Sequence, residues 1–373
     1  MSTIKNYPFY MRATFVLLAL VLTAVILYLG QHIIFPVLLA MLFSILLSPL
    51  VARFNKKLRF PYALAVAVSV ILNIVVISGI VFFVSWQIGD IANDWVKINN
   101  NLSIHYHNIQ HWIKQSFHVS YSEQNKYIKQ ITKESLTNST ANVGTTISSF
   151  TDVLMNLILI PIYTFLFLLY KSLFVNFLYK LFSKEHHDKL KDILSNVKLA
   201  IHSFLIGLIA EMSIVATLTS IGYMIVGVQY ALLLGVITGI LNLIPYIGIT
   251  IAAVLSIFAT LTGSTDLSLI LGVIIVNGIV QFFDNNILVP MVVSSKVKIN
   301  AFVSIISIII GGAIAGVAGM FMAIPMLAII KVIFDRIDFL EPWGYLMGDN
   351  LPANQKTVKI KIPFFKKRKS SEK

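Results

Sequence analysis

Hydrophobic positions in this chain fall into long unbroken runs. Residues 13–52 contain no Asp, Glu, Lys or Arg, and about 20 apolar residues suffice for a helix to cross a bilayer. We therefore predict two crossings in this stretch, with a tight turn near Gly30. The same argument predicts further crossings over residues 60–89, 153–170 and 199–226.

A polar segment, residues 90–152, interrupts these runs. Its lysines and acidic residues balance, and it is rich in Asn, Ser and His. Apolar residues recur within it at helical spacing: Ile98, Leu102, Ile109, Ile113 and Phe117. The pattern predicts an amphipathic helix in a water-facing loop or small subdomain.

Two apolar segments in the second half, residues 230–262 and 300–330, are interrupted and too long for simple crossings. As one helix, the first would measure about 50 Å against a hydrocarbon core of roughly 30 Å. Either each segment crosses once, which gives eight transmembrane helices, or each is a helical hairpin that returns to its starting side. Hairpins place Lys296 and Lys298 on the same side as the basic C-terminal tail, so the positive-inside rule slightly favours them.

Composition supports a membrane protein. The chain of 373 residues is 57% hydrophobic and 12% charged, whereas about a quarter of the residues in a soluble domain are charged. The expected fold class is all-α: a polytopic integral membrane protein with about eight membrane helical segments, two of them candidates for re-entrant hairpins. No cysteine is present, which excludes disulfides, thiol catalysis and cysteine-ligated metals.

The net charge of +13 does not indicate nucleic-acid binding, because the basic residues lie in short clusters beside apolar runs. Such clusters fix membrane orientation. They place residues 53–59, 171–198 and the tail in the cytoplasm and residues 90–152 outside. Both termini are then expected in the cytoplasm.

Ordered motifs in the second half carry a resemblance to a known family. They are YALLLG at 230–235 with NLIPYIG at 242–248, DNNILVP at 284–290, GGAIAGVAG at 311–319 and AIP at 323–325. With the long polar segment after the third helix, the chain resembles the autoinducer-2 exporter (AI-2E) family of bacterial permeases. It departs from the family pattern in lacking a proline near residue 298 and in carrying Glu211.

The resemblance implies a multi-pass permease of the bacterial inner membrane. It also implies a homo-oligomer, with a pentamer as one candidate, and no bound cofactor. The expected function is export of a small polar solute such as the quorum-sensing signal autoinducer-2, and the alternative is a sodium(lithium)–proton antiporter. A non-transporting membrane scaffold is a third hypothesis. The expected partners are the lipid bilayer and either a small polar solute or a proton or monovalent cation.

The layout predicts five units along the chain. They are three N-terminal membrane helices (1–89), an extracytoplasmic polar subdomain (90–152), a fourth helix with a cytoplasmic linker (153–198), a C-terminal transport core (199–335) and a basic cytoplasmic tail (336–373). We expect no enzymatic activity, because the chain has no His-Glu-x-x-His motif and no Gly-x-Ser-x-Gly motif. A Walker loop, which direct ATP coupling would require, is also missing.

Glu211 is a lone acid inside an apolar helix. A carboxylate at membrane depth is costly and usually functional. We interpret it as part of a proton or cation relay, and a packing role with a hydrogen bond to a neighbouring helix is the alternative.

Asn277, Gln281, Asp284 and Asn285 form a polar stripe at helical spacing. They are predicted to line a cavity for a polar solute or small cation, with Asp284 as the leading member. Contacts that only hold helices together are the alternative.

Other candidates lie at the interruptions. Asn242, Pro245, Tyr246 and Gly248 are predicted to form a broken helix tip near the substrate, and a purely structural kink is the alternative. Helix packing or hairpin formation is the prediction for the remaining small residues and one proline: Gly235, Gly239, Gly311, Gly312, Gly316, Gly319 and Pro325. His107 and His111 have a spacing that can bind zinc, but no third ligand is evident and no metal site is expected.

Overall fold

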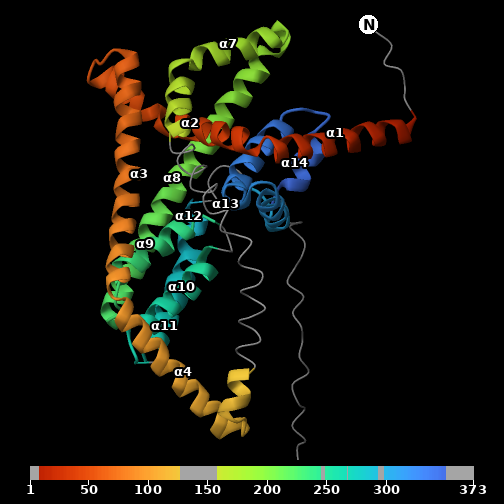
Figure 1. Ribbon diagram of the computed structural model, residues 1–373. Helices are drawn as coiled ribbons and strands as arrows, with labels where there is room; N and C mark the ends of the chain where they lie inside the picture. The colour runs from red at the N-terminus through yellow and green to blue at the C-terminus, as the bar shows by residue number, and fades with distance from the viewer. Residues whose placement is uncertain (1–7, 127–157, 245–247, 267, 293–297, 350–373) are drawn as a thin grey trace, which may run out of the picture.

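The computed structural model describes residues 8–126, 158–244, 248–266, 268–292 and 298–349, and within them the chain is helical without strands (Figure 1). The first half contains α1 (Phe9–Leu29), α2 (Gln31–Lys57), α3 (Tyr62–Asn93), α4 (Trp95–Phe117), the helix Ile158–Leu169 and α7 (Lys171–Leu181). The second half contains α8 (His187–Val226), α9 (Ala231–Leu241), α10 (Gly248–Gly263), α11 (Ser268–Phe283), a π-helical turn η3 (Asp284–Leu288), α12 (Val289–Val292), α13 (Ala301–Phe334) and α14 (Glu341–Met347).

Five of the described helices are long and apolar enough to cross a membrane: α2, α3, α8, α11 with its π turn, and α13. The helix Ile158–Leu169 and α7 add a sixth candidate if they form one span, bent by 65°. Shorter apolar helices are Ala13–Leu29 within α1, α9 and α10. These helices confirm the prediction of an all-α polytopic membrane protein.

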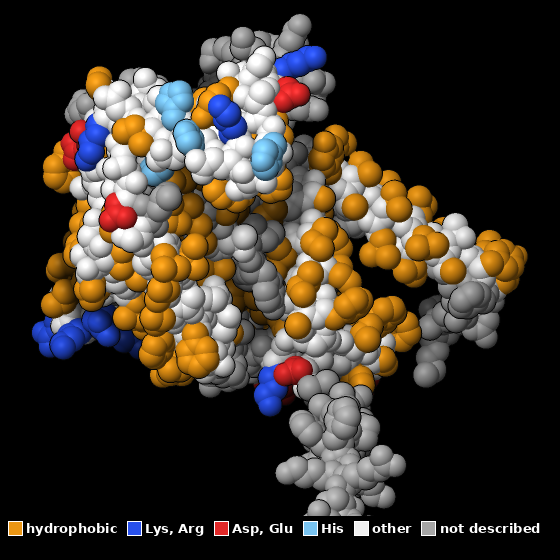
Figure 2. All heavy atoms as spheres, turned by 90° about the horizontal axis from the view of Figure 1, so that it is seen from below, with side chains coloured by type: hydrophobic (Ala, Val, Ile, Leu, Met, Phe, Trp, Pro, Cys, Tyr) orange, Lys and Arg blue, Asp and Glu red, His pale blue; other side chains and the backbone are white. Residues whose placement is uncertain are grey.

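The surface of the molecule is apolar over much of its area. Seen from below the view of Figure 1, hydrophobic side chains cover wide regions, histidine side chains gather in the upper part of the view, and charged side chains lie in several separate places near its edges (Figure 2). Leu17 on α1 is 62% exposed, and Phe82 on α3 is 73% exposed. Apolar surface of this extent is stable in contact with lipid rather than with water.

Helix α8 is the central element, and α2, α9, α11 and α13 all pack against it. Its 40 residues span about 60 Å. The helix begins at His187, well before the crossing predicted from residue 199. Its polar first turns are held by ion pairs from Lys189 to Asp338 and from Arg336 to Asp192, which join them to the chain after α13. We call this the α14 end of the molecule, and the opposite end, where α8 stops, the α4 end.

The N-terminal helices pack around α8 and around each other. One core cluster joins α2, α3 and the helix Ile158–Leu169 through Val51, Val66 and Leu168. Another joins α2, α8 and α13 through Leu42, Ile201 and Met322. Helix α3 runs from the basic end of α2 towards α4 (Figure 1).

Helices α9 and α10 pack against each other and form the first hairpin, hairpin 1. Both of its outer ends meet the start of α4. Before α9, the Oε1 atom of Gln229 accepts a hydrogen bond from Lys97 at 2.7 Å. At the end of α10, the carbonyl of Thr262 accepts one from Asn101 at 2.8 Å. The segment therefore returns to its starting side, as the hairpin alternative predicts.

Helix α13 forms the second hairpin, hairpin 2, because its backbone reverses at Ala315 and Gly316. Gly316 adopts a φ of +56°, which suits glycine. A Cβ on Gly311 would lie 2.9 Å from the carbonyl carbon of Gly319, whereas these positions would be about 12 Å apart in a straight helix. Both arms of the hairpin meet α14, through bonds from Asn300 to Met347 (3.0 Å) and from Lys331 to Gly344 (3.3 Å).

Candidate functional site

Three of the residues selected from the sequence meet in the interior. Glu211 on α8 is 6% exposed, and Asp284 in η3 is 3% exposed. Asn242, at the end of α9, donates a hydrogen bond from Nδ2 to Oε1 of Glu211 at 3.1 Å. The carboxyl group of Asp284 interacts with both Glu211 and Asn242. We call Glu211, Asn242 and Asp284 the carboxyl site.

The tip of hairpin 1 positions Asn242. Helix α9 ends in a tight turn, in which Ile244 N–H donates to the carbonyl of Leu241 at 2.9 Å. A Cβ on Gly248 would collide with that same carbonyl, so glycine allows α10 to begin close to the end of α9. Pro245 and Tyr246, the other residues predicted at this tip, lie outside the described residues.

A π-helical turn positions Asp284. Residues Asp284–Leu288 form η3 between α11 and α12. Such single-turn π segments inside helices are rare and are frequent at functional sites. The wider turn changes the facing of successive residues, so Asp284 and Leu288 are buried while Asn285 is exposed.

The carboxyl site has unused hydrogen-bonding capacity. Oε2 of Glu211 and Oδ1 of Asp284 are both buried, and neither has a hydrogen-bond partner within the described part of the chain. Buried polar atoms are nearly always paired with protein or water. The two free oxygens therefore identify a place for a proton, a cation, water or a polar solute.

The residues of the predicted polar stripe along α11 and η3 lie in different surroundings. Asn277 donates to the hydroxyl of Tyr223 on α8 at 2.8 Å. Gln281 is partly buried, and its Oε1 is another buried atom without a partner among the described residues. Only Asp284 of this stripe reaches Glu211, and the exposed Asn285 points elsewhere.

The selected glycines lie where helices approach most closely. A Cβ on Gly235 would lie 2.8 Å from the carbonyl oxygen of Ala216 on α8, and one on Gly239 would lie 2.6 Å from that of Met212. These contacts bring α9 against α8 and so carry Asn242 to Glu211.

In hairpin 2, a Cβ on Gly312 would meet Met320 at 2.7 Å. Pro325 is fully buried in the second arm.

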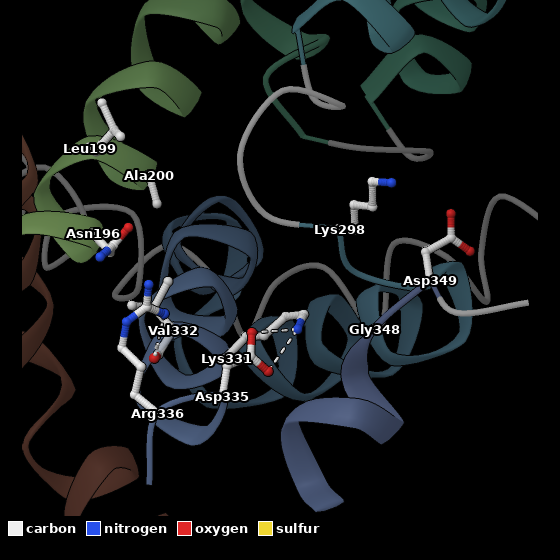
Figure 3. A pocket seen from close by; sticks show the side chains of 10 residues that line it. All are labelled: Asn196, Leu199, Ala200, Lys298, Lys331, Val332, Asp335, Arg336, Gly348 and Asp349. Carbon is white, nitrogen blue, oxygen red and sulfur yellow. Dashed lines mark hydrogen bonds and ion pairs between the residues drawn. The ribbon is translucent and has the colours of Figure 1, made fainter. Parts of the chain in front are cut away.

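A pocket of about 250 Å³ lies at the α14 end (Figure 3). Lys331 is 8% exposed and donates to both carboxylate oxygens of Asp335, at 2.9 and 2.7 Å. The lining residues are Asn196, Leu199, Ala200, Lys298, Lys331, Val332, Asp335, Arg336, Gly348 and Asp349. Lys331, Asp335 and Arg336 were not predicted as site residues from the sequence, because charges at the end of an apolar run commonly mark the membrane surface.

Histidine and acidic side chains give no metal centre in the described ranges, where no three of them are grouped to hold an ion. His107 and His111 are exposed on α4. His105 instead is 5% exposed, and its Nε2 lies 2.9 Å from the carbonyl oxygen of Ser264 after α10. The polar face of α4 therefore contacts hairpin 1, while Ile109 and Phe117 of its apolar face are exposed.

Comparison with known proteins places the chain in a family. The profile of AI-2E family transporters matches residues 17–338. The chain belongs to the AI-2E transporter family. The match spans all three members of the carboxyl site and both hairpins, so these features belong to the part of the chain that the AI-2E profile covers.

Several bacterial relatives of this AI-2E transporter are designated transport proteins or permeases. YueF of Bacillus subtilis (strain 168) is 25% identical over 272 residues, which are 69% of this chain and 73% of YueF. YrrI of the same organism is 36% identical over 119 residues, 32% of this chain and 33% of YrrI. The permease PerM of Escherichia coli (strain K12) is 26% identical over 181 residues, 48% of this chain and 50% of PerM.

Proposed function

We propose that this AI-2E transporter is a secondary permease that exports a small polar solute such as autoinducer-2, with the carboxyl site as its coupling centre. The supporting observation is that the partly buried Asn242 contacts the buried acids Glu211 and Asp284, two of whose carboxyl oxygens have no partner among the described residues. Two acids side by side in an apolar bundle need a counter-charge, which a proton or a monovalent cation supplies.

The broken helices support the same proposal. Backbone groups freed by a helix break cannot face lipid, so they are buried in protein or line a wet cavity. In many transporters, such interrupted helices form the substrate and ion sites. Here the tip of hairpin 1 and the π turn after α11 both border the carboxyl site.

Sodium–proton antiport is the second candidate, and the acid pair itself favours it. Carboxylate and amide oxygens are ligands that hard cations prefer. In an antiporter, Glu211 and Asp284 would carry the proton and the cation in alternation. In an exporter, the same pair would couple a gradient to solute movement.

We also propose an orientation in the bacterial inner membrane. Lys56 and Lys57 end α2 at the opposite end of α3 from α4, and the α14 end carries Lys298, Lys331 and Arg336. By the positive-inside rule, the α14 end is cytoplasmic, the α4 end is extracytoplasmic, and both termini are cytoplasmic. A homo-oligomer, with a pentamer as a candidate, is part of the proposal.

The test is flux in proteoliposomes, measured for sodium, protons and autoinducer-2. Wild type is compared with Glu211→Gln and Asp284→Asn, and Glu185→Gln, an exposed acid outside the site, is the control. Solute export that depends on an ion gradient, lost in Asp284→Asn and retained in Glu185→Gln, is the expected result. Ion exchange without solute movement, abolished by either site variant, would establish the antiporter instead. No flux of any kind from folded protein would leave the scaffold hypothesis.

A further inference from the structure

A second group of buried polar side chains lies on the α4 side of the carboxyl site. Tyr223 on α8 is fully buried, and its hydroxyl accepts a hydrogen bond from Asn277 on α11. Ser256 on α10, 1% exposed, faces the same hydroxyl. Thr219, also fully buried, lies one turn before Tyr223 on the same face of α8. We call Thr219, Tyr223, Ser256 and Asn277 the hydroxyl site.

Two hydroxyls of this site lack the partner that their residue type normally finds. Ser and Thr hydroxyls in helices usually bond the carbonyl four residues earlier. Thr217 on α8 does so at 2.7 Å, and Thr260 on α10 does so at 2.7 Å. By contrast, Thr219 Oγ1 and Ser256 Oγ are buried without a hydrogen bond of normal geometry in the described ranges, although Ser256 interacts with the Tyr223 hydroxyl.

An apolar contact separates the two sites. Val215 is fully buried on α8, one turn from Glu211 on one side and one turn from Thr219 on the other. It packs against Val280 of α11 and Leu288 of η3. The hydroxyl site is therefore distinct from the carboxyl site, and it contains hydroxyl and amide groups but no charged side chain.

Unpaired buried hydroxyls carry a desolvation cost that a bound polar group removes. Because the site is uncharged, the group that fits it is neutral and can donate and accept hydrogen bonds. We propose that Thr219, Tyr223, Ser256 and Asn277 form a second binding site, which takes neutral hydroxyl groups from water or from a small hydroxyl-bearing solute. Solute binding here rests on the proposed permease function, whereas access of water does not.

The absence of native cysteine allows a direct test. Single variants Thr219→Cys and Ser256→Cys are treated with methyl methanethiosulfonate in proteoliposomes. Their matched controls are the neighbouring Leu218→Cys and Leu255→Cys, at the same depth but 39% and 45% exposed on the outer surface of the bundle. The thiolate attacks the methylthio sulfur of the reagent, which forms a methyl disulfide and releases methanesulfinate. The thiolate itself forms only where the thiol is solvated.

We expect the two site cysteines to react about tenfold faster than their controls, because a thiol pKa raised by one unit in lipid leaves about a tenth as much thiolate. Slowing of the reaction by excess erythritol would assign the site to a hydroxyl-bearing solute, and no slowing would assign it to water. Equal, slow reaction of site and control cysteines in folded protein would overturn the proposal. Since labelling needs no flux, its result is independent of the transport assay.

A second measurement covers the case in which a cysteine variant does not fold. Removing an unpaired hydroxyl from a dry interior raises stability, whereas removing one that binds water or solute lowers it. We expect Thr219→Val and Ser256→Ala to lower the unfolding temperature in detergent. An increase for both variants would show a dry interior and would contradict the proposal.

Discussion

At the scale of residues, Asn242 is the contact on which the carboxyl site depends. Its amide is the described partner of Glu211 Oε1, while Oε2 of the same carboxyl has no partner in the described chain. Charge-assisted hydrogen bonds are about twice as strong as neutral ones. Loss of this amide would remove the hydrogen bond that Oε1 of this buried acid accepts from α9.

We predict that Asn242→Ala lowers the free energy of unfolding by about 1–3 kcal/mol, the cost of leaving a buried polar group unsatisfied. Denaturant unfolding in detergent measures the effect. Asn286→Ala, which removes an exposed amide from the same region, should change stability little. If the double variant Asn242→Ala/Glu211→Gln were as unstable as the sum of the single variants, the two side chains would not be coupled.

Lys331 is the second residue with a strong energetic role. The side chain of Lys331 is 10% exposed and pairs with Asp335, whose side chain is 37% exposed. We expect Lys331→Met to destabilise the protein by about 1–3 kcal/mol, below the value for a fully buried pair because water reaches Asp335. Lys189→Met, which breaks the exposed pair with Asp338, is the control and should have little effect. Equal shifts of the unfolding midpoint in Lys331→Met and Lys189→Met would contradict this prediction.

At the scale of elements, close approach of α9 to α8 depends on glycine. Both Gly235 and Gly239 lie where a Cβ would meet the backbone of α8, at distances no side chain tolerates. The approach brings the end of α9 to the middle of α8, where Glu211 lies. The packing of hairpin 1 against α8 therefore depends on its glycines.

We predict that Gly239→Val lowers stability by about 1–3 kcal/mol through overpacking, and that it also reduces flux because Asn242 is displaced from Glu211. Gly278→Ala on α11 is the matched control, since nothing lies within 4 Å of a Cβ there. The control should be neutral or slightly stabilising, because alanine favours helix more than glycine does. Unfolding midpoints and proteoliposome flux of the two variants decide between the outcomes.

The arrangement of the helices also shows which features of the site could be predicted from the sequence. Glu211, Asn242 and Asp284 could be selected because charges and amides are conspicuous in apolar runs. That these three residues lie together could not be predicted, because their contact requires hairpin 1 to fold back against α8. Thr219 and Ser256 went unselected because hydroxyls in membrane helices are common and normally bonded to their own backbone. The π turn, which gives Asp284 and Asn285 different surroundings, has no signature in the helical spacing used to group them.

At the scale of the whole molecule, the two hairpins are anchored at opposite ends. Hairpin 1 begins and ends against α4, and hairpin 2 begins and ends against α14. Helix α8 extends from one anchor to the other. This arrangement gives a clear account of why residues 230–262 and 300–330 are long yet interrupted: each carries two arms and a turn.

The anchor at the α4 end has a pH-dependent member. Tyr230 donates a hydrogen bond to Asp94. Burial first, and then the hydrogen bond and charge of Asp94, raise the pKa of Tyr230 to about 12 from an ordinary value of 10. Because the pKa is raised, the contribution of the Tyr230–Asp94 contact to stability is complete below pH 10 and is lost as the pH rises towards 12.

We predict that the unfolding temperature of wild type falls more steeply between about pH 10 and pH 12 than that of Tyr230→Phe, which has no hydroxyl to titrate. Thermal unfolding in detergent across this range is the measurement. Tyr345→Phe, at an exposed position, serves as control and should follow wild type. Parallel curves for wild type and Tyr230→Phe would show that the contact with Asp94 does not stabilise the anchor.

The contact between α4 and hairpin 1 has a practical consequence. The outer ends of the hairpin that carries Asn242 contact side chains of α4, among them Asn101 and His105. With the α4 end outside the cell as proposed, an antibody fragment that grips α4 would immobilise the hairpin from the surrounding medium. Inhibition of the transporter would then require neither entry into the cell nor competition with its cargo.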